Sequence, residues 1–225
     1  MRLTVRHFYD FGSAAARVGD DLVRPEAWDA VRELPGPFEL PASRAEWEAK
    51  AETPELRARA RDIAAAATRL GARSLCSYGV GNAGLELCVA GAAPHLRLVC
   101  TDFTPRTVGR LRSLFPEAEV VEHDLRTDPP RDVDLHLMHR IDAELAGAGW
   151  KAVFPRYREP ILLVPALLLT WVDAAKEVAR RVRKPRSARA GYFRNEEALR
   201  DLWAETHEDE PLRIGELDAF LLTRR

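Results

Sequence analysis

Two glycines and two aspartates stand where they could bind a nucleoside. Residues 74 to 86 run from a short apolar stretch into a turn containing Gly79 and Gly81, and then into a predicted helix. Glycines there let the backbone turn tightly and approach a ligand, while the free N–H groups of the helix point toward it. Asp102 closes the next apolar run, where a carboxylate can accept both hydroxyls of a ribose, and Asp124 closes the run after that. These residues predict a nucleoside-binding edge.

A candidate general base follows a fourth apolar run. His139 stands at the carboxyl end of this predicted strand, where ligands gather in open α/β sheets. Arg140 and Asp142 follow, so one loop offers a base, a cation and an orienting carboxylate, and we predict catalytic roles for His139 and Asp142. The alternative is that His139 caps the strand or packs on the next helix. His136 lies three residues earlier, on the opposite face of a strand, so no metal site is predicted.

The elements that must position these residues alternate between strand and helix after residue 71. Strands are predicted over 74–78, 96–101, 118–122, 133–138 and 161–164, and helices over 54–70, 83–92, 106–115, 142–154, 166–183 and 195–204. The strands are continuously apolar, which is typical of a parallel sheet buried on both faces. Residues 211–214 and 218–223 predict a closing hairpin. The fold class is therefore α/β: a Rossmann-like, doubly wound, mostly parallel seven-stranded sheet with an antiparallel C-terminal hairpin strand.

Residues 1–70 are predicted to form a helical and irregular N-terminal segment before a core over 71–225. Aromatic residues and prolines are scattered through residues 1–52, and we expect short helices and turns there with no sheet. The aromatic run over residues 7–11 could fold over the site as a lid and cover the substrate, with Tyr9 as a candidate contact to cofactor or substrate. The alternative is that these aromatics cover one face of the sheet. Exposed aromatics there would also permit a homodimer contact.

Composition excludes several classes of function. The chain of 225 residues has 34 basic and 35 acidic residues, so no global field attracts it to nucleic acid or membrane. The three cysteines form no CxxC pair and their number is odd, which argues against a disulfide framework and favours the cytoplasm. No signal peptide or membrane span is predicted. The many arginines and alanines indicate the coding bias of a GC-rich bacterium.

Residues 73–225 resemble the class I S-adenosylmethionine-dependent methyltransferases, through the glycine turn, the two aspartates and the closing hairpin. The resemblance implies that the turn passes under the methionine part of the cofactor, with Ser77 and Tyr78 leading into it. It also implies that Asp102 holds the ribose, that Phe103 lies against adenine, and that Asp124 and the backbone of Leu125 meet the adenine amino group. The chain departs from the family pattern at two positions: Ser77 replaces an acid, and Ala83 replaces a third glycine.

Other functions remain open. Gly79, Gly81, Gly84 and Asp102 also satisfy the dinucleotide fingerprint of an NAD(P)-dependent oxidoreductase, although no tyrosine begins the Tyr-x-x-x-Lys of short-chain reductases. A methyltransferase-like protein without transfer activity is another alternative.

An RNA methyltransferase is the remaining alternative. Basic residues concentrate between 176 and 194, and such a cluster could bind an RNA backbone. However, Met138-His139-Arg140-Ile141 stands where base-modifying enzymes often carry an Asn-Pro-Pro-Tyr type of sequence. We therefore predict an S-adenosylmethionine-dependent O- or N-methyltransferase of a small-molecule acceptor, of the kind used in secondary metabolism, with neither nucleic acid nor membrane as a partner.

Overall fold

The protein is described from a computed structural model of residues 1–225, in which residues 1–8, 24–34, 36, 38–183 and 189–225 are placed. The predicted contact residue Tyr9 lies outside this described part, as does most of the predicted aromatic lid.

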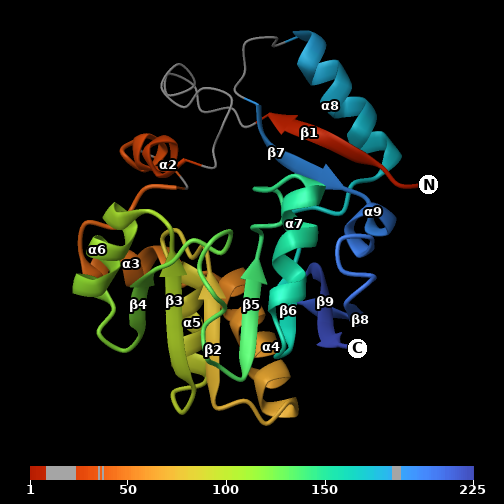
Figure 1. The fold of residues 1–225 in the computed structure, drawn as a ribbon. Coiled ribbons are helices and arrows are strands. Elements are labelled where there is room, and N and C mark those ends of the chain that lie inside the picture. The colour runs from red at the N-terminus through yellow and green to blue at the C-terminus, as the bar shows by residue number, and fades with distance from the viewer. Residues whose placement is uncertain (9–23, 35, 37, 184–188) are drawn as a thin grey trace.

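The sheet confirms the predicted fold class. Its seven strands lie in the order β4-β3-β2-β5-β6-β9-β8, and β9 runs antiparallel to both β6 and β8 while the other pairs are parallel (Figure 1). The strand bounds are β2 Ser74–Tyr78, β3 Arg97–Asp102, β4 Glu119–Glu122, β5 Leu135–His139, β6 Ile161–Val164, β8 His207–Ile214 and β9 Leu217–Arg224. Because side chains alternate across a strand, each strand except β8 supplies apolar residues to two cores.

The two faces of the sheet bury different helices. On one face, Leu135 and Leu137 of β5 pack in a core with α4 (Pro54–Arg69), α5 (Gly84–Ala92) and α6 (Pro105–Leu114). On the other face, Met138 joins a core with α7 (Gly147–Val153), the short 3₁₀ helix Phe154–Arg156 and α9 (Glu196–Arg200). Helix α4 begins where predicted, because the Thr53 hydroxyl accepts a hydrogen bond from the backbone N–H of Leu56.

A second, two-stranded sheet overturns the expectation of no sheet in residues 1–52. Strand β1 (Thr4–Phe8) pairs antiparallel with β7 (Arg189–Arg194), and α8 (Trp171–Arg183) packs against β1. The pairing was missed because the two strands are about 185 residues apart in sequence and neither has a turn connecting it to the other. In Figure 1 this layer and α2 (Pro25–Arg32) lie beyond the carboxyl ends of the parallel strands.

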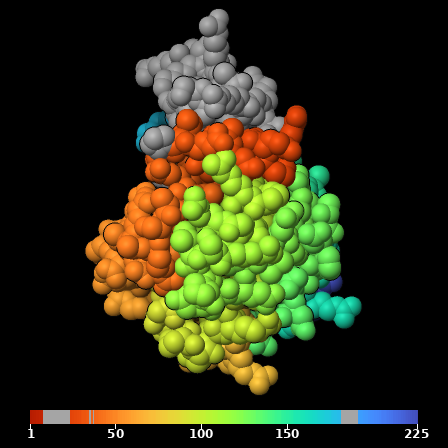
Figure 2. Space-filling view, turned by 90° about the vertical axis from the view of Figure 1, so that its left-hand side faces the viewer, coloured from red at the N-terminus to blue at the C-terminus, as the bar shows by residue number. Residues whose placement is uncertain are grey.

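The short N-terminal helices do form as predicted. Helix α2 packs on α6, while α3 (Arg44–Ala51) contacts α5. Figure 2 shows these orange segments against the yellow-green surface of the central residues. Of the described N-terminal helices, α2 lies at the carboxyl end of the parallel strands, where its Arg32 contacts Asp102. None of the helices in the described part of the chain is long and apolar enough to cross a membrane.

Two predicted helices start later than expected. Helix α8 begins at Trp171, five residues after the predicted start, because Thr170 and Asp173 cap it through reciprocal hydrogen bonds between side chain and backbone. The residues before this cap contact β7 instead, since the Leu169 N–H donates a hydrogen bond to the carbonyl of Arg194 at 2.8 Å. Helix α7 begins at Gly147, five residues after the predicted start at residue 142.

Candidate functional site

The glycine turn after β2 has the backbone that the sequence predicts. Gly79 and Gly81 have φ angles of +64° and +57°, a region that side chains with a Cβ rarely adopt. A Cβ at Gly79 would also lie 2.8 Å from the Cγ2 atom of Ile141. The Gly81 N–H donates to Oδ2 of Asp102 at 3.1 Å, so the turn after β2 and the acid that ends β3 are in direct contact.

Asp102 is already bound by an arginine from the N-terminal segment. Arg32, the last residue of α2, places Nη1 at 3.3 Å from Oδ1 and Nη2 at 3.0 Å from Oδ2. Oδ1 also accepts from the N–H of Thr104 at 2.9 Å, and the Arg32 guanidinium contacts the hydroxyls of Thr104 and Thr107 as well. Both carboxylate oxygens of the predicted ribose ligand therefore have protein donors. Sequence reasoning missed Arg32, because it lies 70 residues before its partner and follows no motif.

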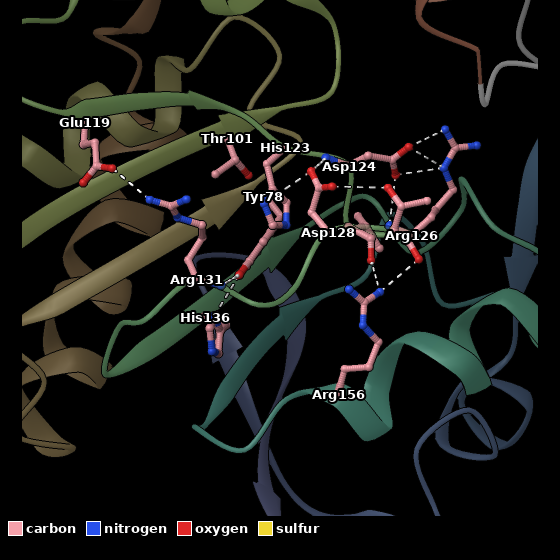
Figure 3. Close-up of polar contacts among 12 residues, drawn as sticks. Tyr78, Thr101, Glu119, His123, Asp124, Arg126, Asp128, Arg131, His136 and Arg156 are labelled. Atoms are coloured by element: carbon pink, nitrogen blue, oxygen red, sulfur yellow. Dashed lines mark hydrogen bonds and ion pairs between the residues drawn. The ribbon is translucent and has the colours of Figure 1, made fainter.

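Asp124 is also paired with an arginine, but a local one. Arg126 holds it with Nε at 2.9 Å from Oδ1 and Nη2 at 2.6 Å from Oδ2, and the Arg126 N–H adds a third bond (Figure 3). Burial alone would raise the pKa of Asp124, but the hydrogen bonds from Arg126 outweigh it and hold the pKa below its usual value. The guanidinium also lies 5.7 Å from the centre of the Phe103 ring, which orders the predicted adenine-contacting pair.

A buried carboxyl from α5 lies beside Ser77. The Ser77 hydroxyl donates to Oε1 of Glu86 at 2.6 Å, and both side chains are buried. Burial raises the pKa of Glu86 to about 7. The acid that the family pattern places at position 77 is thus replaced by a hydroxyl paired with a carboxyl nine residues later. The sequence contained this signal, since Glu86 occupies the first turn of the predicted helix.

A small cavity brings together several of the predicted cofactor residues. Its volume is about 60 Å³, and its wall includes Tyr78, Gly79, Phe103, Asp124 and Leu125. This volume holds a few water molecules and is smaller than a nucleoside. A larger hollow of about 990 Å³ is lined by residues of α3, α4 and α5 and by none of the predicted site residues.

The wall of the small cavity also contains Glu144, which sequence reasoning missed. Burial, with a smaller contribution from Asp142, raises the pKa of Glu144 to about 8, although a hydrogen bond with Trp28 lowers it. The side chain combines cavity access with a carboxyl that is largely protonated at neutral pH. Nothing in the sequence around residue 144 distinguishes it from an ordinary surface glutamate.

The predicted catalytic residues His139 and Asp142 lie away from this cavity. His139 follows the alternation of Leu135 and Leu137, so it shares the sheet face of α4, where burial and then Arg140 lower its pKa to about 3. Asp142 is buried, and its Oδ1 accepts from the Ala166 N–H at 2.6 Å. No hydrogen bond joins these two described side chains, and neither is among the cavity-lining residues. The assignment of catalytic roles to them stays a prediction.

His136 points to the opposite face from His139, as predicted. Its Nδ1 lies 3.1 Å from the Tyr78 hydroxyl, which also accepts from the Arg131 N–H at 3.2 Å (Figure 3). Burial lowers the pKa of His136 to about 4. His136 therefore contacts Tyr78, which in turn lines the cavity. Within residues that the structure describes, no group of three or more histidine, cysteine or acidic side chains is arranged to hold a metal ion.

Comparison with solved structures identifies the fold. The chain is similar to human N-acetylserotonin methyltransferase in complex with S-adenosylmethionine, with a TM-score of 0.61 and 16% identity over 96% of this chain and 65% of that one. The chain has the class I S-adenosylmethionine-dependent methyltransferase fold. It is also similar to PigF solved with S-adenosylhomocysteine, at TM-score 0.64 and 14% identity over 96% of this chain and 68% of that chain.

A third solved structure extends this similarity. For the mitomycin 7-O-methyltransferase MmcR the TM-score is 0.58 with 18% identity, over 95% of this chain and 76% of that one. The chain therefore spans slightly less than two thirds of the human methyltransferase, about two thirds of PigF and about three quarters of MmcR. No family model matches the chain, and no curated protein matches it in sequence.

Proposed function

We propose that this protein binds S-adenosylmethionine at the glycine turn and transfers its methyl group to a small-molecule acceptor. The observation that carries the proposal is the contact between the Gly81 N–H and the Asp102 carboxylate, at the carboxyl edge of a methyltransferase-type sheet. Nucleoside ligands of open α/β sheets bind at this edge. Three proteins of similar structure are methyltransferases or were solved with S-adenosylmethionine or its product.

The donor set of the site fits a nucleoside chemically. A carboxylate can accept two ribose hydroxyls, an aromatic ring can stack on a base, and the glycines leave the backbone open to close approach. However, Asp102 uses both oxygens to bind Arg32, and a ribose would compete for them. We therefore propose that α2 carries Arg32 away from Asp102 when cofactor binds, and that this exchange enlarges the cavity of about 60 Å³.

For methyl transfer the protein must align the acceptor with the methyl group and exclude water, and it need not form a covalent bond itself. When bound, S-adenosylmethionine supplies an already activated methyl group. The apolar side chains Phe103, Ile141 and Leu145 at the cavity wall would exclude water and favour a small, partly apolar acceptor.

An acceptor hydroxyl or ammonium must also lose a proton. Glu144 is the better-placed base, since it lines the cavity and its pKa of about 8 makes its carboxylate, the form that prevails above that pH, a stronger proton acceptor than Asp124, whose pKa is lowered. His139 and Asp142 remain the alternative that the sequence suggests. The substitution Glu144→Gln should lower kcat with little change in cofactor affinity. If His139→Gln lowered kcat and Glu144→Gln left it unchanged, the alternative would be favoured.

The cofactor assignment is tested by ligand-dependent thermal unfolding. At a cofactor concentration of 100 times Kd, binding should stabilise the native state by about 2.7 kcal/mol. S-adenosylmethionine and S-adenosylhomocysteine should both raise Tm, and NADPH should not. The Asp102→Asn protein is the control that should lose the shift. Stabilisation by NADPH alone would favour the oxidoreductase, and no shift with any of these ligands in wild type and Arg32→Ala would refute nucleoside binding here.

A further inference from the structure

Helix α8 is oriented with its apolar side toward solvent. Trp171, Val172 and Val178 are 58%, 62% and 58% exposed. By contrast, Ala174 is only 8% exposed, and the charged side chain of Glu177 is only 14% exposed. A surface helix of a globular protein normally buries its apolar stripe and exposes its charges. This helix does the reverse.

The reversed orientation has a physical cause on the buried side. Glu177 lies with Oε1 at 3.3 Å from Nδ1 of His7 in β1, and the His7 side chain is only 12% exposed. The His7 ring in turn stacks on Phe193 of β7, with ring centres 3.9 Å apart. This contact between two largely buried polar side chains, together with the packing of α8 on β1, fixes the rotation of the helix. The apolar residues on the opposite side are consequently turned outward, as an exposed patch that a monomer rarely carries without use.

The charged residues of α8 are also distributed unevenly, with the cations beside its exposed apolar side. Exposed cations flank the apolar side: the Lys176 side chain is 73% exposed and that of Arg180 is 37% exposed. The two acids of the helix are on its inner side: Asp173 caps the helix with Thr170 and lies 3.6 Å from Lys176, and Glu177 contacts His7 and lies 3.8 Å from Arg180. Both ion pairs are long, and most of the Lys176 side chain remains in solvent. Beyond Glu177 the sequence has no acid until residue 196, and over that span it has seven cations: Arg180, Arg181, Arg183, Lys184, Arg186, Arg189 and Arg194.

We propose that α8 is an interfacial helix that binds the surface of an anionic lipid bilayer. A helix with tryptophan and valine on one side and lysine and arginine beside them inserts its apolar side into the headgroup region, while the cations meet anionic lipids. The 13-residue helix would lie in the plane of the membrane along about 20 Å. This binding mode needs no membrane-spanning segment, and it does not depend on the proposed methyl transfer.

Two other occupants fit the surface less well. A second copy of the chain would bring the same cations toward one another across the apolar contact, and like charges oppose such an interface. A protein groove usually encloses a helix on more than one side, but β1 already covers the inner side of α8. A flat anionic surface needs only the side that is exposed. The near-zero net charge of the chain predicted no attraction to membranes. A net charge does not show that the cations are concentrated around α8 while most of the acids lie elsewhere in the chain.

Vesicle sedimentation tests the proposal. Wild-type protein should sediment with vesicles of equal parts phosphatidylcholine and phosphatidylglycerol, but not with pure phosphatidylcholine, and added salt should release it. Trp171→Glu/Val178→Glu and, separately, Lys176→Glu/Arg180→Glu should each weaken binding at least about tenfold. Val172→Glu/Val178→Glu is a second apolar variant in case the first unfolds. Arg61→Glu/Arg110→Glu makes the same charge change at exposed positions on α4 and α6 and should weaken binding much less.

Three results would overturn the proposal. The first is wild-type protein that stays in solution with anionic vesicles at low salt. The second is vesicle binding that survives the apolar substitutions unchanged, since the helix face would then have no part in it. The third is a wild-type dimer, seen by light scattering, that Trp171→Glu/Val178→Glu converts to monomer, because the patch would then be a subunit interface.

Discussion

The two carboxylates predicted to bind the cofactor are each paired with an arginine, but the pairs differ in range and burial. Asp102 is bound by Arg32 from 70 residues away, and the two side chains are 2% and 6% exposed. Asp124 is bound by Arg126 from two residues away, with side chains 26% and 36% exposed. The first contact fixes the N-terminal helix α2 over the site, whereas the second orders only its own loop.

The difference teaches how each carboxylate could accept a ligand. Removing one partner of a buried ion pair typically costs about 3–5 kcal/mol, because the other charge stays buried and uncompensated. An exposed pair contributes about 0–1 kcal/mol. A ligand at Asp102 must therefore replace the donors of Arg32 with donors of its own, while a ligand at Asp124 displaces Arg126 at little cost. We therefore expect the displacement of Arg32 from Asp102 to be the step that controls cofactor entry in the proposed function.

The largest effect is expected from Asp102→Asn. The substitution leaves Arg32 buried without its anion and deprives the Gly81 and Thr104 N–H groups of a charged acceptor. The free energy of unfolding should fall by about 3–5 kcal/mol, as measured by urea denaturation without ligand. A fall below about 1 kcal/mol would contradict the distinction between the two pairs, because Asp102 would then behave as an exposed acid.

A third acid, Glu86, sharpens the comparison because its side chain accepts a hydrogen bond from the Ser77 hydroxyl and not from an arginine. Its pKa of about 7 lies above the ordinary value of 4.5, so the native state binds more protons than the unfolded state between these values. Its contribution to stability is therefore complete below about pH 4.5 and is lost as pH rises through 7, by about 3 kcal/mol. Glu86→Gln should flatten this pH dependence of urea denaturation. An unchanged profile would show that Glu86 is not the titrating group.

Cofactor affinity should respond oppositely to loss of the two arginines. Arg32→Ala removes the competitor for Asp102 and should tighten S-adenosylmethionine binding about tenfold, equivalent to about 1.4 kcal/mol, even though the free protein becomes less stable. Arg126→Ala, the matched control, should change affinity less than about threefold, since its pair is exposed. Isothermal titration calorimetry measures both. Weaker binding in Arg32→Ala would mean that Arg32 supports the site instead of competing for it.

The smallest effect is expected from Asp124→Asn. Its carboxylate is partly exposed, and Arg126 can be solvated by water when the charge is lost, so the free energy of unfolding should fall by less than about 1 kcal/mol. Cofactor affinity should change modestly, because an amide can still hydrogen-bond an adenine amino group. A loss as large as that of Asp102→Asn would remove the basis for treating the two pairs differently.

Much of the sheet could be predicted because its signals are local. The bounds of β2 and β6 match the predicted strands 74–78 and 161–164, since each is a short apolar run ended by a turn. The tight turn at Gly79 and Gly81 was likewise predicted from residue type alone, and the positive φ angles of both residues agree with it. Strand β1 was not predicted, because its partner β7 lies at the other end of the chain and its five residues show neither an apolar run nor a clean alternation of polar and apolar side chains.

The amino-acid sequence by itself determined the order of the elements, the glycine turn and the positions of Asp102 and Asp124 at strand ends. These features depend on neighbouring residues, through backbone sterics and apolar runs. Only the tertiary structure decided what the carboxylates bind and which way α8 faces. Arg32 reaches Asp102 across 70 residues, and Glu177 reaches His7 across the two-stranded sheet. Such contacts depend on the packing of distant segments, which no local pattern encodes.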